Sequence, residues 1–398
     1  MNADWLAAEG ERLLLFGEQS ALSGGGFGWL STDGEVVDRP LELWINCRMT
    51  HVYSVAHLAG RPGSGALALH GAEALRGIFR DDTHGGWFAQ VGPDGPVTTA
   101  KTAYEHAFVL LAASSAAAAG VPGADGLLTE ARDVLLARFW DDEHGMLVEE
   151  WDRSWSVLDG YRGVNANMHG VEALLAAADA LDDASLRARA LRMMTRVVGT
   201  LAPANDWRLP EHFDATWSPV PDYNVDEPAH PFRPYGATIG HALEWSRLAL
   251  HLHAALGSQA PDWLLEHARA LFEAAVRDGW SVDGAPGFVY TTDWEGRPVV
   301  RERMHWVVAE GVATATALRS ATGDASYDEW SRTWWEHIQE HFVDPEGGSW
   351  WHELSPSLTP SEKVWAGKPD VYHAYQATLF GRLPLAPTMA TALRTAGS

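Results

Sequence analysis

Residues 84–87 read His-Gly-Gly-Trp, and variants of this stretch recur along the chain. Each variant follows an acidic or polar turn and joins one or two glycines to a large apolar residue. Successive copies lie about 60 residues apart, or about twice that where residues 206–214 fill the middle of the gap. The repeat therefore predicts six equivalent loops. The clear copies are Gly25-Gly26-Phe27, His84-Gly85-Gly86-Trp87, His144-Gly145-Met146, Pro286-Gly287-Phe288 and Gly347-Gly348-Ser349-Trp350.

Between the loops, apolar residues recur with the period of amphipathic helices, and turns rich in glycine and proline separate the helices of each pair. Six helical hairpins can close into a ring without unpaired ends. The sequence therefore predicts an all-α fold, an (α/α)6 barrel with short β-hairpins in the long loops, as one catalytic domain spanning residues 1–398. The predicted helices are Ala3–Glu18, Leu41–Leu58, Ala66–Phe79, Thr99–Ala119, Ala124–Phe139, Asn165–Leu181, Ala184–Leu201, Ala237–Leu256, Pro261–Arg277, Arg301–Ala321, Ser326–Phe342 and Asp370–Leu383.

The composition excludes several classes of protein. The 398 residues carry 29 Lys and Arg against 53 Asp and Glu, a formal charge of −24, which disfavours binding to nucleic acid and to anionic membranes. The single cysteine, Cys47, rules out an internal disulfide and a cysteine-built zinc site. No apolar run is long enough to cross a bilayer, and residues 1–5 lack the features of a signal peptide. We therefore predict a cytoplasmic protein without nucleic-acid or membrane partners.

Six chemically distinctive residues lie near the starts of the helices that follow the long loops, roughly one repeat apart. If these helices line the ring, their side chains converge at the mouth where the loops lie, and helix N-termini there favour an anionic ligand or a developing oxyanion. Such a mouth is the default binding site of a barrel. The six residues are Arg48, Tyr104, His169, His241, Trp306 and His373.

These residue types suit proton transfer on a sugar carbonyl. Imidazoles take and give protons near neutral pH, and a guanidinium can hold an oxyanion. Tryptophan rings stack on the C–H faces of sugars. Glu244, three residues after His241, could orient that imidazole, and Asn165 lies four residues before His169 on the same helical face.

Five segments resemble the N-acylglucosamine 2-epimerase superfamily, in order along nearly the whole chain. Within it, Phe288–Trp294 followed by Arg303–Trp306 is more similar to the aldose–ketose isomerase branch. The segments are Trp44-Ile45-Asn46-Cys47-Arg48-Met49-Thr50-His51, Asn165-Ala166-Asn167-Met168-His169, Gly240-His241-Ala242-Leu243-Glu244-Trp245, Arg303-Met304-His305-Trp306 and Tyr372-His373-Ala374-Tyr375-Gln376.

This resemblance implies an (α/α)6 barrel that acts on a monosaccharide through a cis-enediolate, with neither metal nor cofactor. His373 would be the base that moves the proton between C1 and C2, and His241 the partner acid or base. The favoured reaction is D-mannose to D-fructose. A 2-epimerase acting on cellobiose, mannose or N-acylglucosamine is the alternative. The resemblance implies that His169, Arg48, Tyr104 and Asn165 hold sugar oxygens, that Trp306 and Trp365 pack on the ring and, by a weaker match, that Arg233 binds the sugar. His169 and Arg48 are also candidate catalytic residues. By their positions in the sequence, Glu244 and Asp370 are further substrate-binding candidates.

Other readings compete with this one. His337-Ile338-Gln339-Glu340-His341 matches the His-x-x-Glu-His pattern of inverted zinc peptidases, but on a helix that enters a loop. A glycoside hydrolase or lyase would need opposed carboxylates, of which only Asp370 lies near the repeat-spaced set. A sugar-binding module without catalysis would leave the spaced histidines without a purpose. The oligomeric state, monomer or homo-oligomer, stays open.

Overall fold

The computed structural model describes residues 2–396, which divide into two compact units. Unit 1 contains the chain up to Leu13, Met194–Lys368 and His373–Ala386, and unit 2 contains Leu14–Met193, Pro369–Tyr372 and the chain from Pro387. The ends of the predicted domain, residues 1 and 397–398, lie outside the described residues. That the chain forms one catalytic domain stays a prediction. Helix α1 (Ala3–Glu18) begins in unit 1 and ends in unit 2.

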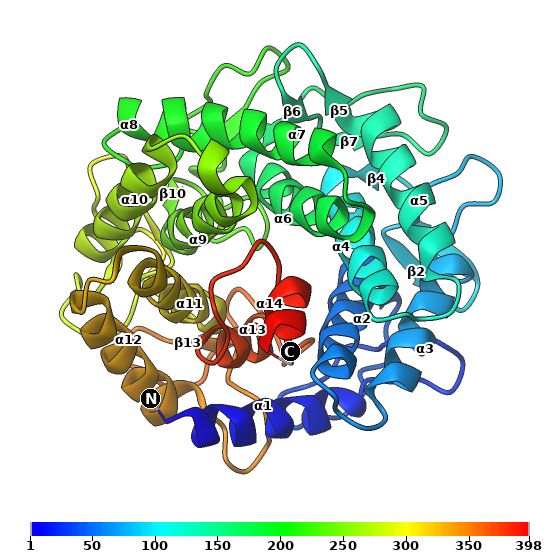
Figure 1. Ribbon diagram of the computed structural model, residues 1–398, viewed down its shortest axis with the longest axis horizontal. Coiled ribbons are helices and arrows are strands. Elements are labelled where there is room, and N and C mark those ends of the chain that lie inside the picture. Colours follow the sequence, from blue (N-terminus) through cyan, green and yellow to red (C-terminus); the bar gives the residue numbers. More distant parts are fainter. Residues whose placement is uncertain (1, 397–398) are drawn as a thin grey trace. The chain divides into compact units, whose positions relative to one another are not determined.

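In unit 2, α2, α4 and α6 pack side by side, with α3 against α2 and α5 against α4 (Figure 1). Helix α4 is buried on nearly all sides, whereas α5 buries only Ala124, Leu127, Leu128 and Ala131. A helix that is apolar on all sides is enclosed by its neighbours, whereas a helix with one apolar stripe packs by that face and exposes the other. The helices are α2 (Leu43–Leu58), α3 (Ser64–Arg76), α4 (Ala103–Ala118), α5 (Ala124–Val134) with the π-helical turn η1 (Leu135–Phe139), α6 (Val164–Leu181), α7 (Ala184–Met194) and α14 (Met389–Ala396).

Unit 1 repeats this pattern. Helix α9 packs against α10 and α11, and α11 packs against α12 (Figure 1). None of the helices in the described range is long and apolar enough to span a membrane. The helical elements are η2 (Thr195–Leu201), α8 (Ala202–Ala204), α9 (Ile239–Leu256), η3 (Gly257–Gln259), α10 (Trp263–Gly279), α11 (His305–Thr322), α12 (Ser326–His337), η4 (Ile338–Phe342) and α13 (Tyr372–Phe380).

Short strands lie in the long loops, as predicted, and several directly precede an enclosed helix. In unit 2, β1, β2 and β3 form one antiparallel sheet, β4 pairs with β7 and β5 with β6; in unit 1, β10 pairs with β11 and β12 with β13. The strands are β1 (Leu41–Glu42), β2 (Gln90–Gly92), β3 (Gly95–Thr98), β4 (Lys101–Thr102), β5 (Trp140–Asp141), β6 (Met146–Leu147), β7 (Glu150–Trp151), β8 (Arg162–Gly163), β9 (His212–Phe213), β10 (Ala237–Thr238), β11 (Thr291–Thr292), β12 (Arg303–Met304) and β13 (Glu353–Leu354).

The repeated glycine signature has a conformational cause. In all five copies a glycine adopts a positive φ, a region where a Cβ is strained. At Gly86 (φ 71°) a Cβ would also lie 2.8 Å from His106 Nε2 and from the Trp155 ring. The apolar residue that follows closes the turn: Trp87, for example, forms a β-bridge with Arg80.

The predicted helices are confirmed, with corrections at their ends. Helices expected to begin at Leu41 and Arg301 begin two and four residues later, because the intervening backbone forms β1 and β12 and their approaches. Helix α14 was missed, because eight residues are too few for periodicity to distinguish a helix from an irregular segment.

Candidate active site

In unit 1, helix starts bring two predicted histidines to one tryptophan. His241 is the third residue of α9, Trp306 the second of α11 and His373 the second of α13. The Trp306 ring centroid lies 5.4 Å from that of His241 and 5.7 Å from that of His373, both in tilted arrangements. The structure thus brings three of the six predicted residues into contact through the Trp306 ring.

A buried carboxylate orients His241. Its Nδ1 donates to Glu211, lying 3.0 Å from both Oε1 and Oε2. Both side chains are buried. With the proton held on Nδ1, Nε2 is the ring atom that can exchange a proton with a ligand. The predicted partner, Glu244, instead forms an ion pair with Arg247, with Arg247 Nη2 3.2 Å from Glu244 Oε1.

His373 is oriented in the same way, but its carboxylate partner also forms an ion pair with an arginine. Its Nδ1 lies 3.1 Å from Glu310 Oε1, and Arg247 Nε donates to Glu310 Oε2 at 2.6 Å. Burial alone would raise the pKa of Glu310, but Arg247 and His373 together lower it. The carboxylate partners of the two histidines therefore differ. Glu310 forms an ion pair with Arg247, whereas no arginine or lysine within residues 2–396 pairs with Glu211.

Two further predicted residues of unit 1 lie in its loops. Trp365 is half-buried and its ring packs edge-on against Phe232, at 5.1 Å between centroids. The neighbouring Arg233 is also half-buried, and its backbone amide donates to His230 Nδ1 at 3.0 Å. Both residues are therefore held by contacts with other loop residues.

In unit 2, Arg48 of α2 is the centre of a second group. Its Nη1 lies 3.1 Å from Asp370 Oδ2, and its Nη2 donates to the Tyr104 hydroxyl at 3.2 Å. Its guanidinium also lies over the rings of Phe108 and Tyr372. Burial opposes its charge, but Tyr104 and Asp370 raise the pKa of Arg48 above its ordinary value. The two terminal nitrogens of the guanidinium therefore bind two different side chains.

His169 of α6 joins this second group through aromatic contacts. Its ring centroid lies 5.4 Å from that of Tyr104 and 4.5 Å from that of Phe108. Its Nδ1 is 3.5 Å from Glu172 Oε2, which accepts a shorter bond of 2.6 Å from the Tyr372 hydroxyl. Asn165 is half-buried at the start of the same helix. Four of the predicted residues of unit 2 are therefore connected by direct contacts: Asp370 to Arg48, Arg48 to Tyr104, and Tyr104 to His169.

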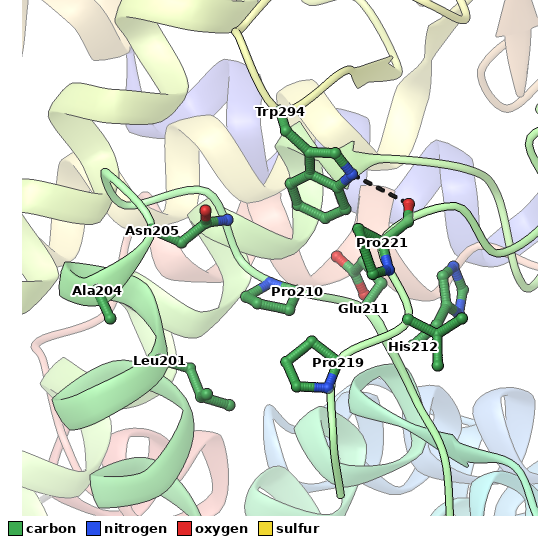
Figure 2. Close-up of a pocket in the computed structure, with 10 residues that line it drawn as sticks. Leu201, Ala204, Asn205, Pro210, Glu211, His212, Pro219, Pro221 and Trp294 are labelled. Carbon is green, nitrogen blue, oxygen red and sulfur yellow. Dashed lines mark hydrogen bonds between the residues drawn. The ribbon is translucent and has the colours of Figure 1, made fainter.

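A pocket of about 320 Å³ in unit 1 adjoins Glu211. Trp294 and three prolines surround it, and the Trp294 Nε1 donates to the Pro221 carbonyl at 3.0 Å (Figure 2). Neither His241 nor His373 lines this pocket. This pocket therefore touches the carboxylate partner of His241 without being lined by either predicted catalytic histidine.

Metal-ligand readings find limited support. Glu244, Glu310 and His373 place donor atoms close together, but Arg247 lies among them and supplies the positive charge that two buried carboxylates require. For the His-x-x-Glu-His alternative, no third His, Cys, Asp or Glu donor within residues 2–396 completes a group with His337 and His341. Burial lowers the pKa of His337 to about 3, as expected for a neutral core imidazole.

Sequence reasoning missed three residues of the unit 1 site. Glu310 and Arg247 did carry a signal, since each is a charged residue inside an otherwise apolar stretch of a buried helix. Glu211 carried none. It lies in the irregular loop before β9, where neither helical nor strand periodicity marks it.

Comparison with known proteins identifies the family. The N-acylglucosamine 2-epimerase (GlcNAc 2-epimerase) family matches residues 25–377. The chain belongs to this family. It is 53% identical to a D-mannose isomerase of Thermobifida fusca over 99% of this chain and 97% of that protein. It is 50% identical to a D-mannose isomerase of Pseudomonas cannabina pv. alisalensis, over 98% and 94% of the two chains.

A solved structure of a D-mannose isomerase superposes on this family member with a TM-score of 0.89. The two sequences are 29% identical, and the match covers 95% of this chain and 97% of the other. The predicted fold class, all-α of the (α/α)6 type with short β-pairs in its loops, is thereby confirmed.

Proposed function

We propose that the protein is an aldose–ketose isomerase that interconverts D-mannose and D-fructose by proton transfer through a cis-enediolate. One observation carries the proposal: His241 and His373 contact the same Trp306 ring, and a buried carboxylate holds the Nδ1 of each. The relatives named D-mannose isomerase support the choice of sugar. We also propose that the whole chain acts as one catalytic domain in the cytoplasm.

The charges behind the two histidines support different duties. Arg247 neutralises part of the Glu310 charge, so His373 gains less stabilisation as an imidazolium and suits the base. Glu211 lacks such a cation among the described residues, so His241 suits the acid that protonates sugar oxygens. In the step from aldose to ketose, His373 takes the C2 proton and the C2–H electron pair forms the C1–C2 double bond, leaving negative charge on O1. His241 gives its proton to O1. The proton on His373 then bonds to C1 while the O2 proton passes to His241, which creates the C2 carbonyl and returns both histidines to their starting states.

The remaining predicted residues are proposed as ligands of the sugar. Trp306 and Trp365 would stack on its C–H faces, and Arg48, Tyr104, His169 and Asn165 would bind its oxygens, with Arg233, Glu244 and Asp370 as supporting candidates. The Arg247 guanidinium, already paired with both Glu244 and Glu310, supports proton transfer without a metal or other cofactor.

A 2-epimerase is the second candidate, because the family includes that activity and the same imidazoles could return the proton to the opposite face of C2. A hydrolase is less favoured, since the buried carboxylates at the histidines are engaged by imidazole and guanidinium groups. Product analysis by NMR separates the three. The protein is incubated with D-mannose, cellobiose or N-acetylmannosamine. D-fructose from mannose supports the isomerase, whereas a C2 epimer or a reducing sugar released from cellobiose overturns it.

A further inference from the structure

The segment 361–367, which carries Trp365, contains neither helix nor strand. Ser361, Val364 and Trp365 are only half-buried, so apolar burial alone does not order them. A tryptophan that stacks on a sugar must nevertheless be held in one place, because misplacement costs binding. Something else must fix this segment.

The buried carboxylate of Glu353, 1% exposed, collects the donors of the segment. Its Oε1 accepts from the Ser361 hydroxyl at 2.6 Å and from the Lys363 amide at 2.9 Å. Its Oε2 accepts from the amides of Val364 and Trp365 at 2.8 and 2.9 Å. Three consecutive amides thus converge on one side chain, and hydrogen bonds to a charged acceptor are stronger than neutral ones.

The backbone of Glu353 pairs with the strand that leads into the helix of Trp306. Glu353 pairs with Met304 in the β12–β13 ladder, and Met304 directly precedes α11, the helix that carries Trp306. On the surface, Lys363 Nζ adds an ion pair of 2.6 Å with Glu302, the residue before β12. One buried residue therefore connects the segment of Trp365 to the start of the Trp306 helix.

We infer that Glu353 is a positioning residue, whose carboxylate holds Trp365 at a fixed place relative to Trp306 and so sets the affinity for the sugar. The inference deepens the proposed function, because it rests on the contact of both tryptophans with the sugar. Glu353 itself takes no part in proton transfer. Its loss should weaken binding while the histidines keep their geometry.

Glu353→Gln tests this directly. The amide keeps one acceptor oxygen but turns an NH₂ group toward two backbone donors, so half of the cluster is lost. We expect KM to rise about tenfold or more and kcat to change by less than about threefold, the pattern of lost ground-state binding. Ser361→Ala, which removes one of the four donors, is the milder second variant. Lys363→Met, which removes the ion pair with the buried Glu302 but keeps the residue 363 amide on Glu353, separates the contribution of that side chain from that of the cluster.

Trp365→Phe provides a double-mutant cycle. If Glu353 acts through Trp365, the KM effects of Glu353→Gln and Trp365→Phe do not add in the double variant. Additive effects, or an unchanged KM in Glu353→Gln, overturn the inference.

The lysine content gives a readout that is independent of activity. The chain has three lysines, Lys101, Lys363 and Lys368. Lys101 and Lys368 are fully buried, whereas Lys363 is 61% exposed and its following peptide bond lies inside the cluster. Endoproteinase Lys-C should therefore cut first after Lys363, at a rate that reports local opening.

We expect cleavage after residue 363 to be at least tenfold faster in Glu353→Gln than in the wild type and to have an intermediate rate in Ser361→Ala. The double variant Lys363→Arg/Glu353→Gln, which lacks the cleavage site, should not be cut there. Equal cleavage rates in wild type and Glu353→Gln overturn the positioning of the segment. Faster cleavage with an unchanged KM overturns its link to sugar binding. Failure of the wild type to convert D-mannose overturns the proposed function alone, and the proteolysis still decides whether Glu353 holds the segment.

Discussion

His373 and Arg247 bind the same carboxylate: His373 Nδ1 lies 3.1 Å from Glu310 Oε1 and Arg247 Nε 2.6 Å from Oε2. All three side chains are buried. Imidazole and guanidinium therefore compete for one negative charge. Both partners depend on Glu310, which makes it the first target for mutation.

Glu310→Gln should lower kcat on the order of 10²-fold, toward the lower end of what general acid–base catalysis contributes, because His373 loses its orienting anion and Arg247 loses its partner. Steady-state turnover of D-mannose checks this. Glu340→Gln is the matched control, since Glu340 is 76% exposed. Near wild-type turnover in Glu310→Gln would contradict an orienting function.

His373→Ala should remove exchange of the C2 hydrogen with C1 or solvent. Loss of a general base costs about 10²–10⁴-fold in rate. Turnover of D-mannose deuterated at C2, followed by NMR, measures the step itself. His341→Ala serves as control on a partly exposed histidine. Activity above about one percent of wild type would exclude His373 as the base, given that minimum contribution.

Arg48→Lys should reduce activity at least tenfold although the charge is kept. A guanidinium reaches Asp370 and the Tyr104 hydroxyl at once, at 3.1 and 3.2 Å, and a single ammonium does not reproduce that planar fork. The comparison is Arg319→Lys, whose exposed ion pair with Asp328 should be dispensable. A mild effect in Arg48→Lys would make Arg48 a structural residue.

Prolonged treatment with a chelator should leave activity intact. Arg247 already provides the cation between Glu244 and Glu310, so these carboxylates need no metal for charge balance. Activity is assayed before and after dialysis against EDTA. Loss of turnover that one divalent metal restores would overturn the proposed proton-transfer chemistry.

Acid should destabilise the protein through His106. Burial lowers the pKa of His106 to about 3, and its Nε2 accepts from the Trp87 amide at 3.2 Å, which requires the neutral ring. The unfolded chain binds this proton near its ordinary pKa of 6.5, so stability is lost as the pH falls below 6.5, by up to about 1.4 kcal/mol per pH unit. Urea unfolding between pH 7.5 and 5 should show a shallower pH dependence in His106→Gln. An unchanged slope would contradict this assignment.

Much of the fold could be predicted because its causes are local. A glycine with positive φ recurs in five of the six loops, and the apolar stripes between the loops specify helices. The same regularity brought His241, Trp306 and His373 together in the prediction, since each begins a helix of the same kind. Helix α14 escaped because it is short.

The partners of these residues could not be predicted, because they come from elsewhere in the chain. Glu211 precedes His241 by 30 residues and Glu310 precedes His373 by 63. Glu244 has the right spacing on the helix, yet its carboxylate binds Arg247. Helical spacing shows which side chains share a face but not which buried charge each one meets.

The sequence by itself determined the helical repeat, the fold class and the residue types at the start of each enclosed helix. Backbone conformation and apolar periodicity act over a few residues, so they can be read from the chain. Only the tertiary structure decided that Glu211 and Glu310 orient the histidines and that Glu353 gathers the amides beside Trp365. A buried carboxylate must find donors wherever the packed chain brings them, and that pairing is settled in three dimensions.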